Sequence, residues 1–270
     1  MTVGFLAEIV HENEAKIRAP DYVAALPARP RSAAPSFRAA VERDRDRGAL
    51  VVEYKRVSPG RPEPVLPERS VARFVELVGP AAPTALSCLA TIPRFDGSPS
   101  DVRELATAAA LPVLFKDFVV AERQVEVAAR TGAGAVLLIA RLATEGLLRA
   151  PLSALADSAH RHGLEVVLEY HSRAELSRVG DVPADVYGVN VRDLNTLRLD
   201  PSTAQETIRA AREAGLHPLL GLSGVESPSD AQRFWEQGVD GILVGSAVAR
   251  SPDPAGFLST LRRDRNGGSR

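Results

Sequence analysis

The sequence contains a single cysteine, Cys88, so it can form no disulfide within the chain and no cysteine-based metal site. Cys88 lies in the apolar segment 85–90. We therefore expect this residue to be a buried core thiol and not a nucleophile.

Excess charge and long apolar runs are also missing. The formal net charge is -1, which provides no basic field of the kind that holds nucleic acid. Residues 1–18 carry His, Glu, Asn and Lys among their apolar residues and so lack the uninterrupted apolar segment of a secretory signal. No run reaches the roughly 18 apolar residues that cross a bilayer. We expect a cytoplasmic protein with neither a membrane nor a nucleic-acid partner.

What the chain does contain is a repeating pattern over 270 residues, of which 45% are apolar. That length and that apolar content suit one large α/β domain. Short apolar runs alternate with longer segments whose apolar residues recur at spacings of three and four. The expected strands are 50–54, 85–89, 113–115, 135–139, 165–169, 186–189, 218–220 and 241–244. The clearest expected helices are 103–110, 122–130, 152–162, 203–214 and 231–237.

Glycines and capping residues support these boundaries. Ser229 and Asp230 are suited to start the helix at 231–237. Glycines that relieve a left-handed conformation follow four expected helices, at Gly132, Gly163, Gly215 and Gly238. Nearly continuous apolar strands that alternate with helices indicate a parallel sheet covered by helices. Eight such units favour a closed (β/α)8 barrel, a TIM barrel, over an open sheet.

Residues 1–47 stand outside the repeat. Two groups of apolar residues at helical spacing lie in this segment: Leu6, Ile9, Val10 and Ile17, and then Phe37, Ala40 and Val41. We expect an N-terminal helical extension packed on the barrel, although a mobile tail is the alternative. The expected division is an extension at 1–47, a barrel at 48–262 and a flexible tail at 263–270.

Polar residues follow the expected strands at their carboxyl ends, where the active site of such a barrel forms. Lys55 and Lys116 leave apolar strands there, with Glu53 and Glu169 as counter-charges. We expect burial and neighbouring cations to lower the pKa of each lysine and make it a general acid. The alternative is a pair of structural ion pairs, but buried ion pairs stabilise poorly, which favours chemistry.

Small residues dominate the ends of the last two strands. Gly-Leu-Ser-Gly at 221–224 and Gly245-Ser246 can present backbone N–H groups to a phosphate, with Ser58 and Ser223 adding hydroxyl groups. Each glycine alone is better explained by a tight turn. Two adjacent Gly/Ser turns indicate a phosphate site.

At this point the motifs resemble those of the indole-3-glycerol phosphate synthase family. Seven segments occur in the family's order over nearly the whole chain: EYKRVSP at 53–59, FDGS at 95–98, PVLFKDF at 112–118, GAVLLI at 134–139, Leu168-Glu169, GVNVRDL at 188–194, and the Ser223-Gly224 pair. A single motif of this kind is weak, but the ordered set is strong.

The resemblance implies a carboxy-lyase of aromatic amino acid (tryptophan) biosynthesis that needs no metal or organic cofactor. Its substrate would be 1-(2-carboxyphenylamino)-1-deoxyribulose 5-phosphate, and its products indole-3-glycerol phosphate, CO2 and water. The implied catalytic residues are Lys116 as general acid in ring closure, Lys55 at the substrate carboxylate, Glu53 and Glu169 in proton transfer, Asn190 at the substrate hydroxyls, and Arg192 in the charge network. The implied binding residues are Ser58, Ser223, Gly224, Gly245 and Ser246 for phosphate and Phe95, Phe118, Leu137 and Leu194 around the ring.

The chain departs from the family pattern at the seventh strand, where the family has Ser-Glu-Ser-Gly and this chain has Leu222 in place of the glutamate. Arg94 also replaces a common aromatic residue, Thr91 stands where Asp is frequent, and Ser-Pro is followed by Gly60-Arg61-Pro62. Leu222 makes the binding pocket more apolar. We therefore hypothesise a specialised indole pathway and a ring-substituted substrate.

Three other functions remain open at this stage. A phosphoribosyl isomerase would place its acid–base pair on other strands. A catalytically silent barrel would bind a sugar phosphate or a partner protein without turnover, but it would not need all the charged residues of the pocket. Nothing in the sequence favours a purely structural partner. We expect a monomer that acts on a phosphorylated small molecule.

Overall fold

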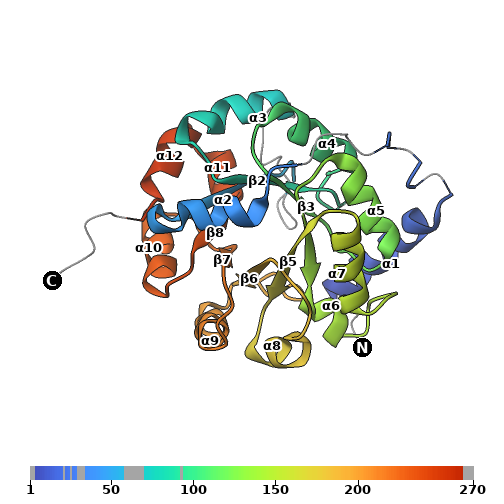
Figure 1. The fold of residues 1–270 in the computed structure, drawn as a ribbon. Coiled ribbons are helices and arrows are strands. Elements are labelled where there is room, and N and C mark those ends of the chain that lie inside the picture. Colours follow the sequence, from blue (N-terminus) through green and yellow to red (C-terminus); the bar gives the residue numbers. More distant parts are fainter. Residues whose placement is uncertain are drawn as a thin grey trace.

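The computed structural model describes residues 4–20, 22–24, 26–28, 34–57, 70–91 and 94–263. In these ranges eight parallel strands, each paired with the next and the last with the first, close into a barrel (Figure 1). The expected (β/α)8 fold is confirmed. The strands are β1 (Ala49–Tyr54), β2 (Ala85–Leu89), β3 (Val113–Lys116), β4 (Ala135–Ile139), β5 (Glu165–Tyr170), β6 (Val186–Asn190), β7 (Leu219–Leu222) and β8 (Gly241–Val244).

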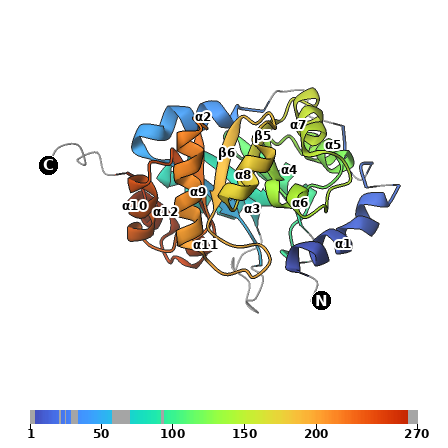
Figure 2. The ribbon, with the colours of Figure 1, turned by 90° about the horizontal axis from the view of Figure 1, so that it is seen from below.

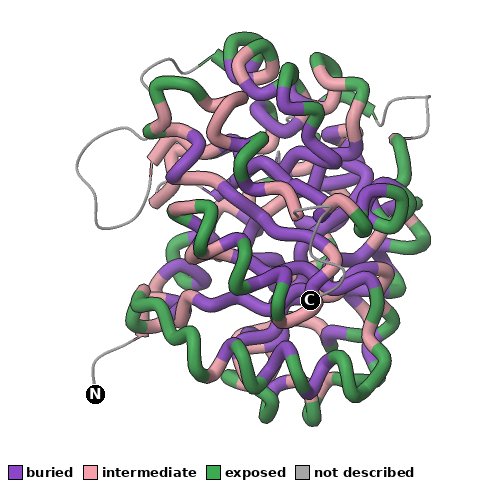
Figure 3. Tube along the Cα trace, turned by 90° about the vertical axis from the view of Figure 1, so that its left-hand side faces the viewer, coloured by how far each residue is buried: buried purple, intermediate pink, exposed green. Residues whose placement is uncertain are grey.

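Helices surround the barrel because each has an apolar stripe that must be covered. In α7, for example, Leu152, Leu155, Ala156 and Ala159 are buried at spacings of three and four. Buried chain therefore lies inside and exposed chain on the outer helix faces (Figure 3). The helices are α1 (Phe5–Arg18), α2 (Phe37–Asp44), α3 (Val71–Val78), α4 (Pro99–Ala108), α5 (Glu122–Thr131), α6 (Ala140–Thr144), α7 (Leu152–Arg161), α8 (Arg173–Val179), α9 (Pro201–Glu213), α10 (Pro228–Glu236), α11 (Ser246–Arg250) and α12 (Pro254–Thr260), with short 3-10 turns η1 (Arg45–Arg47) and η2 (Gly79–Ala81).

Three helices begin earlier than expected. The predicted start of α10 at Ser229 and Asp230 is wrong, because Pro228 is its first residue and the hydroxyl of Ser227 accepts the N–H of Asp230. Helices α4 and α9 likewise begin at Pro99 and Pro201. Proline suits the first helical position, because its missing N–H has no partner in the helix and its φ is already helical.

Strand β7 also differs from the expectation of 218–220. It extends through Leu222, which pairs with Asn190 of β6 on one side and with Leu243 of β8 on the other. Gly221 and Leu222 are therefore strand residues, and the turn out of the strand begins at Ser223. Both Ser223 and Gly224 have positive φ, at 64° and 77°.

The two N-terminal helices pack at opposite ends of the barrel (Figure 2). Helix α2 covers the amino-terminal end, where Phe37 is fully buried and the hydroxyl of Ser36 donates to Glu165 at the start of β5. Helix α1 lies at the other end, where the N–H of Leu6 donates to Asn195 in the segment after β6. The expected helices therefore exist and pack on the barrel. Residues 264–270 of the expected tail, and residues 29–33 between the two helices, lie outside the described residues.

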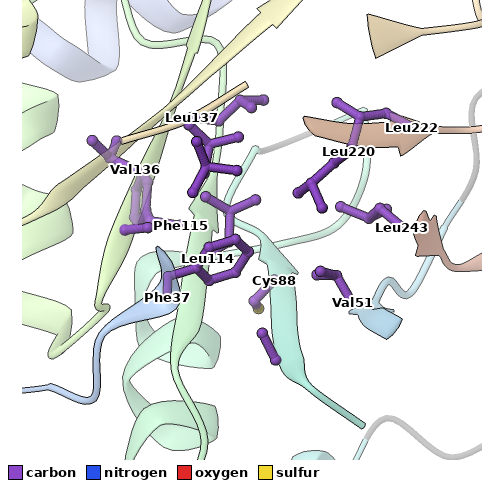
Figure 4. Close-up of a cluster of buried hydrophobic side chains, with 14 of the residues drawn as sticks. Phe37, Val51, Cys88, Leu114, Phe115, Val136, Leu137, Leu220, Leu222 and Leu243 are labelled. Carbon is purple, nitrogen blue, oxygen red and sulfur yellow. The ribbon is translucent and has the colours of Figure 1, made fainter. Parts of the chain in front are cut away.

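Apolar side chains fill the barrel below its mouth, including Val51, Leu114, Leu137, Leu220 and Leu243 (Figure 4). Cys88 is also fully buried, as expected. Burial raises the pKa of the Cys88 thiol well above its ordinary value, which suppresses the reactive thiolate. No helix in the described part of the chain combines the length and apolar character needed to cross a membrane.

Candidate active site

A pocket opens at the carboxyl ends of the strands, and all eight strands or the segments after them contribute to its wall. The expected site residue Ser58 lies outside the described residues. All the other expected site residues line this one pocket: Glu53, Lys55, Phe95, Lys116, Phe118, Leu137, Glu169, Asn190, Arg192, Leu194, Leu222, Ser223, Gly224, Gly245 and Ser246. Their individual roles remain predictions.

Glu53 lies between two lysines at the centre of this pocket. Its Oε1 is 3.0 Å from the Lys55 ammonium group and its Oε2 is 3.4 Å from that of Lys116. Burial alone would raise the pKa of Glu53, but the two ammonium groups lower it to about 2. The carboxylate is therefore ionised at neutral pH and can accept a proton.

Lys116 is held in its charged form by its neighbours. Burial lowers its pKa, but the carboxylates of Glu53 and Glu169 outweigh burial and the charge of Arg192, so the pKa is raised. The prediction of a lowered pKa is therefore wrong for Lys116, because two nearby carboxylates, and not cations, dominate its surroundings. The ammonium group has a proton to donate, as a general acid must.

A second carboxylate, Glu169 at the end of β5, also lines the pocket and acts electrostatically on Lys116. Its Oε1 accepts a hydrogen bond of 3.1 Å from the side-chain amide of Asn190. The oxygen of that amide accepts the N–H of Arg192 at 3.0 Å, which fixes how the amide is turned. Arg192 is fixed in turn by a bond of 2.7 Å from its guanidinium to the carbonyl of Leu197.

The edge formed by β7 and β8 is built from small residues. Ser223 and Gly224 turn the chain out of β7, and Gly245 and Ser246 follow β8 beside them. At Gly245 a Cβ atom would lie 2.8 Å from Oε1 of Glu53. A side chain at position 245 would thus displace that carboxylate, so the close approach requires glycine.

An apolar wall completes the pocket. The ring centroids of Phe95 and Phe118 lie 6.2 Å apart. Leu137 and Leu194 also line this wall. Leu222 is buried and packs over Gly188, where a Cβ atom would lie 2.7 Å from its Cδ1. The residue that departs from the family pattern is therefore a well-packed part of the wall.

Several residues of the pocket were missed from the sequence. Phe5 reaches the pocket from α1, and Arg94 holds that helix by ion pairs with Glu8 and Glu12. Its guanidinium also lies 5.5 Å from the centre of the Phe5 ring. No local signal marks this contact, because Arg94 is separated from Glu12 by 82 residues and from Glu8 by 86 residues.

Asp117 is the second missed residue. Its carboxylate accepts hydrogen bonds from the hydroxyl of Thr91 at 2.7 Å and from the N–H of Phe118 at 2.9 Å. The side-chain amide of Gln124 adds a third, at 3.4 Å. These bonds hold the turn that carries Lys116 and Phe118. The adjacent Lys-Asp-Phe motif was a signal that could have indicated it.

Other lining residues also carried no sequence signal, namely Leu89, Ile139, Leu197, Val225, Glu226, Leu243 and Val244. Over the ranges that the structure describes, no three or more His, Cys, Asp or Glu side chains are grouped so that they could hold a metal ion. The polar side chains that line the pocket carry ammonium, carboxylate, amide, guanidinium and hydroxyl groups.

Comparison with known proteins gives a consistent result. A family model described as indole-3-glycerol phosphate synthase matches residues 6–261. An indole-3-glycerol phosphate synthase of Staphylococcus aureus (strain bovine RF122 / ET3-1) is 33% identical over 227 residues, which are 84% of this chain and 84% of the relative. That of Methanopyrus kandleri is 36% identical over 215 residues, which are 79% and 82% of the two chains.

Among solved structures, a thiamine phosphate pyrophosphorylase from Pyrococcus furiosus matches with a TM-score of 0.56 and 18% identity, over 80% of this chain and 94% of that chain. At this level of identity the likeness concerns the fold alone.

Proposed function

The chain belongs to the indole-3-glycerol phosphate synthase family, and we propose that it converts 1-(2-carboxyphenylamino)-1-deoxyribulose 5-phosphate into indole-3-glycerol phosphate, CO2 and water. The observation that carries the proposal is the placement of Glu53 between Lys55 and Lys116 in one pocket. Family membership makes the enzyme a carboxy-lyase of tryptophan biosynthesis.

Ring closure needs an acid at the carbonyl oxygen of the ribulose chain. The ammonium group of Lys116 donates this proton while the ring carbon that bears the carboxylate attacks the carbonyl carbon. Its raised pKa keeps the proton on the lysine until the oxygen becomes basic. Phe95, Phe118, Leu137 and Leu194 enclose the aromatic ring and hold the two reacting carbons together.

Loss of CO2 then breaks the bond between the ring and its carboxylate, and the electron pair restores the aromatic ring. Lys55 holds that carboxylate before it leaves. Dehydration follows, in which an acid protonates the leaving hydroxyl and a base removes a proton from the new ring. Glu53, ionised between two ammonium groups, serves as base, and Lys55 or Lys116 supplies the acid.

Glu169 assists these proton transfers. Its negative charge also stabilises the charged form of Lys116. Asn190 orients Glu169 and the substrate hydroxyls, and Arg192 secures Asn190. The phosphate group binds at Ser223, Gly224, Gly245 and Ser246, with Ser58 as a further donor. Serine hydroxyls and small residues that expose backbone suit a phosphate at this edge of a barrel.

Turnover of the purified protein with this substrate tests the proposal, followed by indole fluorescence and confirmed by the mass of the product. Formation of indole-3-glycerol phosphate by the wild type, and its loss in Lys116→Ala, is the expected result. Saturable binding without an indole product would overturn the proposed function and indicate a catalytically silent homologue. No structural observation favours that alternative. We also predict that the protein is a monomer and that it is cytoplasmic.

A further inference from the structure

The two oxygens of Glu169 have different surroundings. Oε1 accepts the amide of Asn190 and lies 3.5 Å from Nε2 of His171. Oε2 is buried and has no hydrogen bond to any described residue. Protein groups thus contact one oxygen, while the other has no hydrogen-bond partner among the described residues.

His171 itself does not line the pocket. It follows β5, is 3% exposed, and contacts Glu169, which does line the pocket. The ring Nδ1 of His171 is 3.6 Å from Oε2 of Glu175 in α8. The backbone N–H of His171 donates to the same oxygen at 2.7 Å. A buried imidazole therefore has a carboxylate near each ring nitrogen, at 3.5 and 3.6 Å, but neither nitrogen makes a hydrogen bond to a described residue.

The flanking carboxylates continue into a chain of alternating charge. Glu175 accepts a bond of 2.8 Å from the guanidinium of Arg141 in α6, and Arg141 also pairs with Asp193 in the segment after β6. Burial would raise the pKa of Glu175, but His171 and Arg141 lower it, so Glu175 is ionised. On the pocket side, Glu169 in turn faces Lys116.

This arrangement constrains how many protons the imidazole of His171 carries. A neutral imidazole has one N–H donor and one acceptor nitrogen, whereas ionised carboxylates only accept. One of the two nitrogens would therefore face a carboxylate without a proton between them. An imidazolium has a donor on each side and matches both partners. Its charge also offsets those of two buried carboxylates, each of which is costly when unpaired.

We propose that His171 is a positioning residue for Glu169: as an imidazolium fixed by Glu175 and Arg141, it holds Oε1 and keeps the carboxylate charged, so that Oε2 faces the substrate. This inference deepens the proposed function and rests on it for the role of Glu169 in turnover. His171 does not touch the substrate and acts through Glu169.

The His171→Gln variant tests this role, with His160→Gln as the matched control. His160 also pairs with a carboxylate, that of Asp185, but at the opposite end of the barrel. We expect His171→Gln to lower kcat by up to about 100-fold, the cost of a small misplacement of a catalytic group. KM should stay close to that of the wild type. The pH profile of kcat should differ from that of the wild type on its acid side, because glutamine removes a charged group beside Glu169.

A merely structural histidine would give a different result. The variant would then lose thermal stability and kcat together, with an unchanged pH profile, and this outcome would overturn the proposal. A wild-type kcat in His171→Gln would do the same. Adding His171→Gln to Glu169→Gln should cause little further loss, since the first residue acts through the second. Independent, multiplying losses would contradict that.

Imidazole 15N spectra of the full chain separate this inference from the proposed function, because they need no turnover. Glu169→Gln should shift the Nε2 resonance of His171, which lies 3.5 Å from Oε1 of Glu169, and leave the resonances of His160 unchanged. A His171 resonance that does not respond would overturn the inference even in an active enzyme. If the wild type makes no indole product but His171 responds, the proposed function fails and the placement of charge on Glu169 stands.

Discussion

Glu53 and Lys116 form an ion pair of 3.4 Å across the mouth of the barrel, joining β1 to β3 over the intervening β2. The second oxygen of Glu53 lies 3.0 Å from Lys55. One buried carboxylate therefore contacts both lysines, and the expected chemistry of the pocket depends on it.

Lys116→Ala should reduce turnover by about 10²- to 10⁴-fold, the contribution of a positioned general acid. The fold should persist, since Lys116 is the last residue of β3 and is not part of the apolar core. Indole formation measures turnover, and circular dichroism measures whether the fold persists. Lys16→Ala is the matched control, because Lys16 is the only lysine outside the pocket. If Lys116→Ala keeps most of its rate, another group is the acid.

Glu53→Gln should lower kcat and move its alkaline limb to lower pH. Glu53 helps to raise the pKa of Lys116, so without Glu53 the ammonium group is lost at a lower pH. Activity that needs this proton then declines earlier as the pH rises. The measurement is kcat across the alkaline range for the wild type and the variant. An unchanged limb would show that Lys116 is not the group whose proton loss limits turnover.

Ser223→Ala should raise KM by roughly tenfold and change kcat little, because a hydrogen bond to a charged group contributes about 1.5–3 kcal/mol. Phosphate binding is shared by the ground state and the transition state. Alanine keeps the Cβ atom, so the positive φ of 64° is no more strained than in the wild type. Ser259→Ala on the exposed face of α12 is the control. A large fall in kcat at constant KM would rule out this role for Ser223.

Leu222 should favour a substrate with an apolar substituent on its ring. An added methylene in an apolar pocket changes selectivity by about 10- to 200-fold. The ratio of kcat/KM for substituted and unsubstituted substrates measures the preference, in the wild type and in Leu222→Glu. The variant should lose the preference, and its Tm should fall because a carboxylate replaces a buried side chain. Equal kcat/KM values across the panel in the wild type would refute the specialised substrate.

Hydrophobic periodicity in the sequence predicted all eight strands in their order, but α3, α6, α8, α11 and α12 were not among the expected helices. Strand β4 was predicted with the bounds that the structure has, because an apolar run follows the turn at Gly132 there. The start of α10 and the end of β7 were predicted wrongly. The start of α10 is fixed by a proline at the first helical position, which is visible in the sequence. The end of β7 is fixed by pairing with β6 and β8, which depends on the tertiary structure.

The sequence by itself determined which strand-end residues meet in the pocket, because the carboxyl ends of parallel strands meet at one mouth whatever the details of packing. Only the tertiary structure decided their electrostatics. Lys116 was expected to have a lowered pKa, but closure of the barrel places two carboxylates beside it and raises that pKa. The contact of His171 with Glu169 and Glu175 was equally hidden, since distances of a few ångströms between side chains depend on packing that no residue pattern specifies.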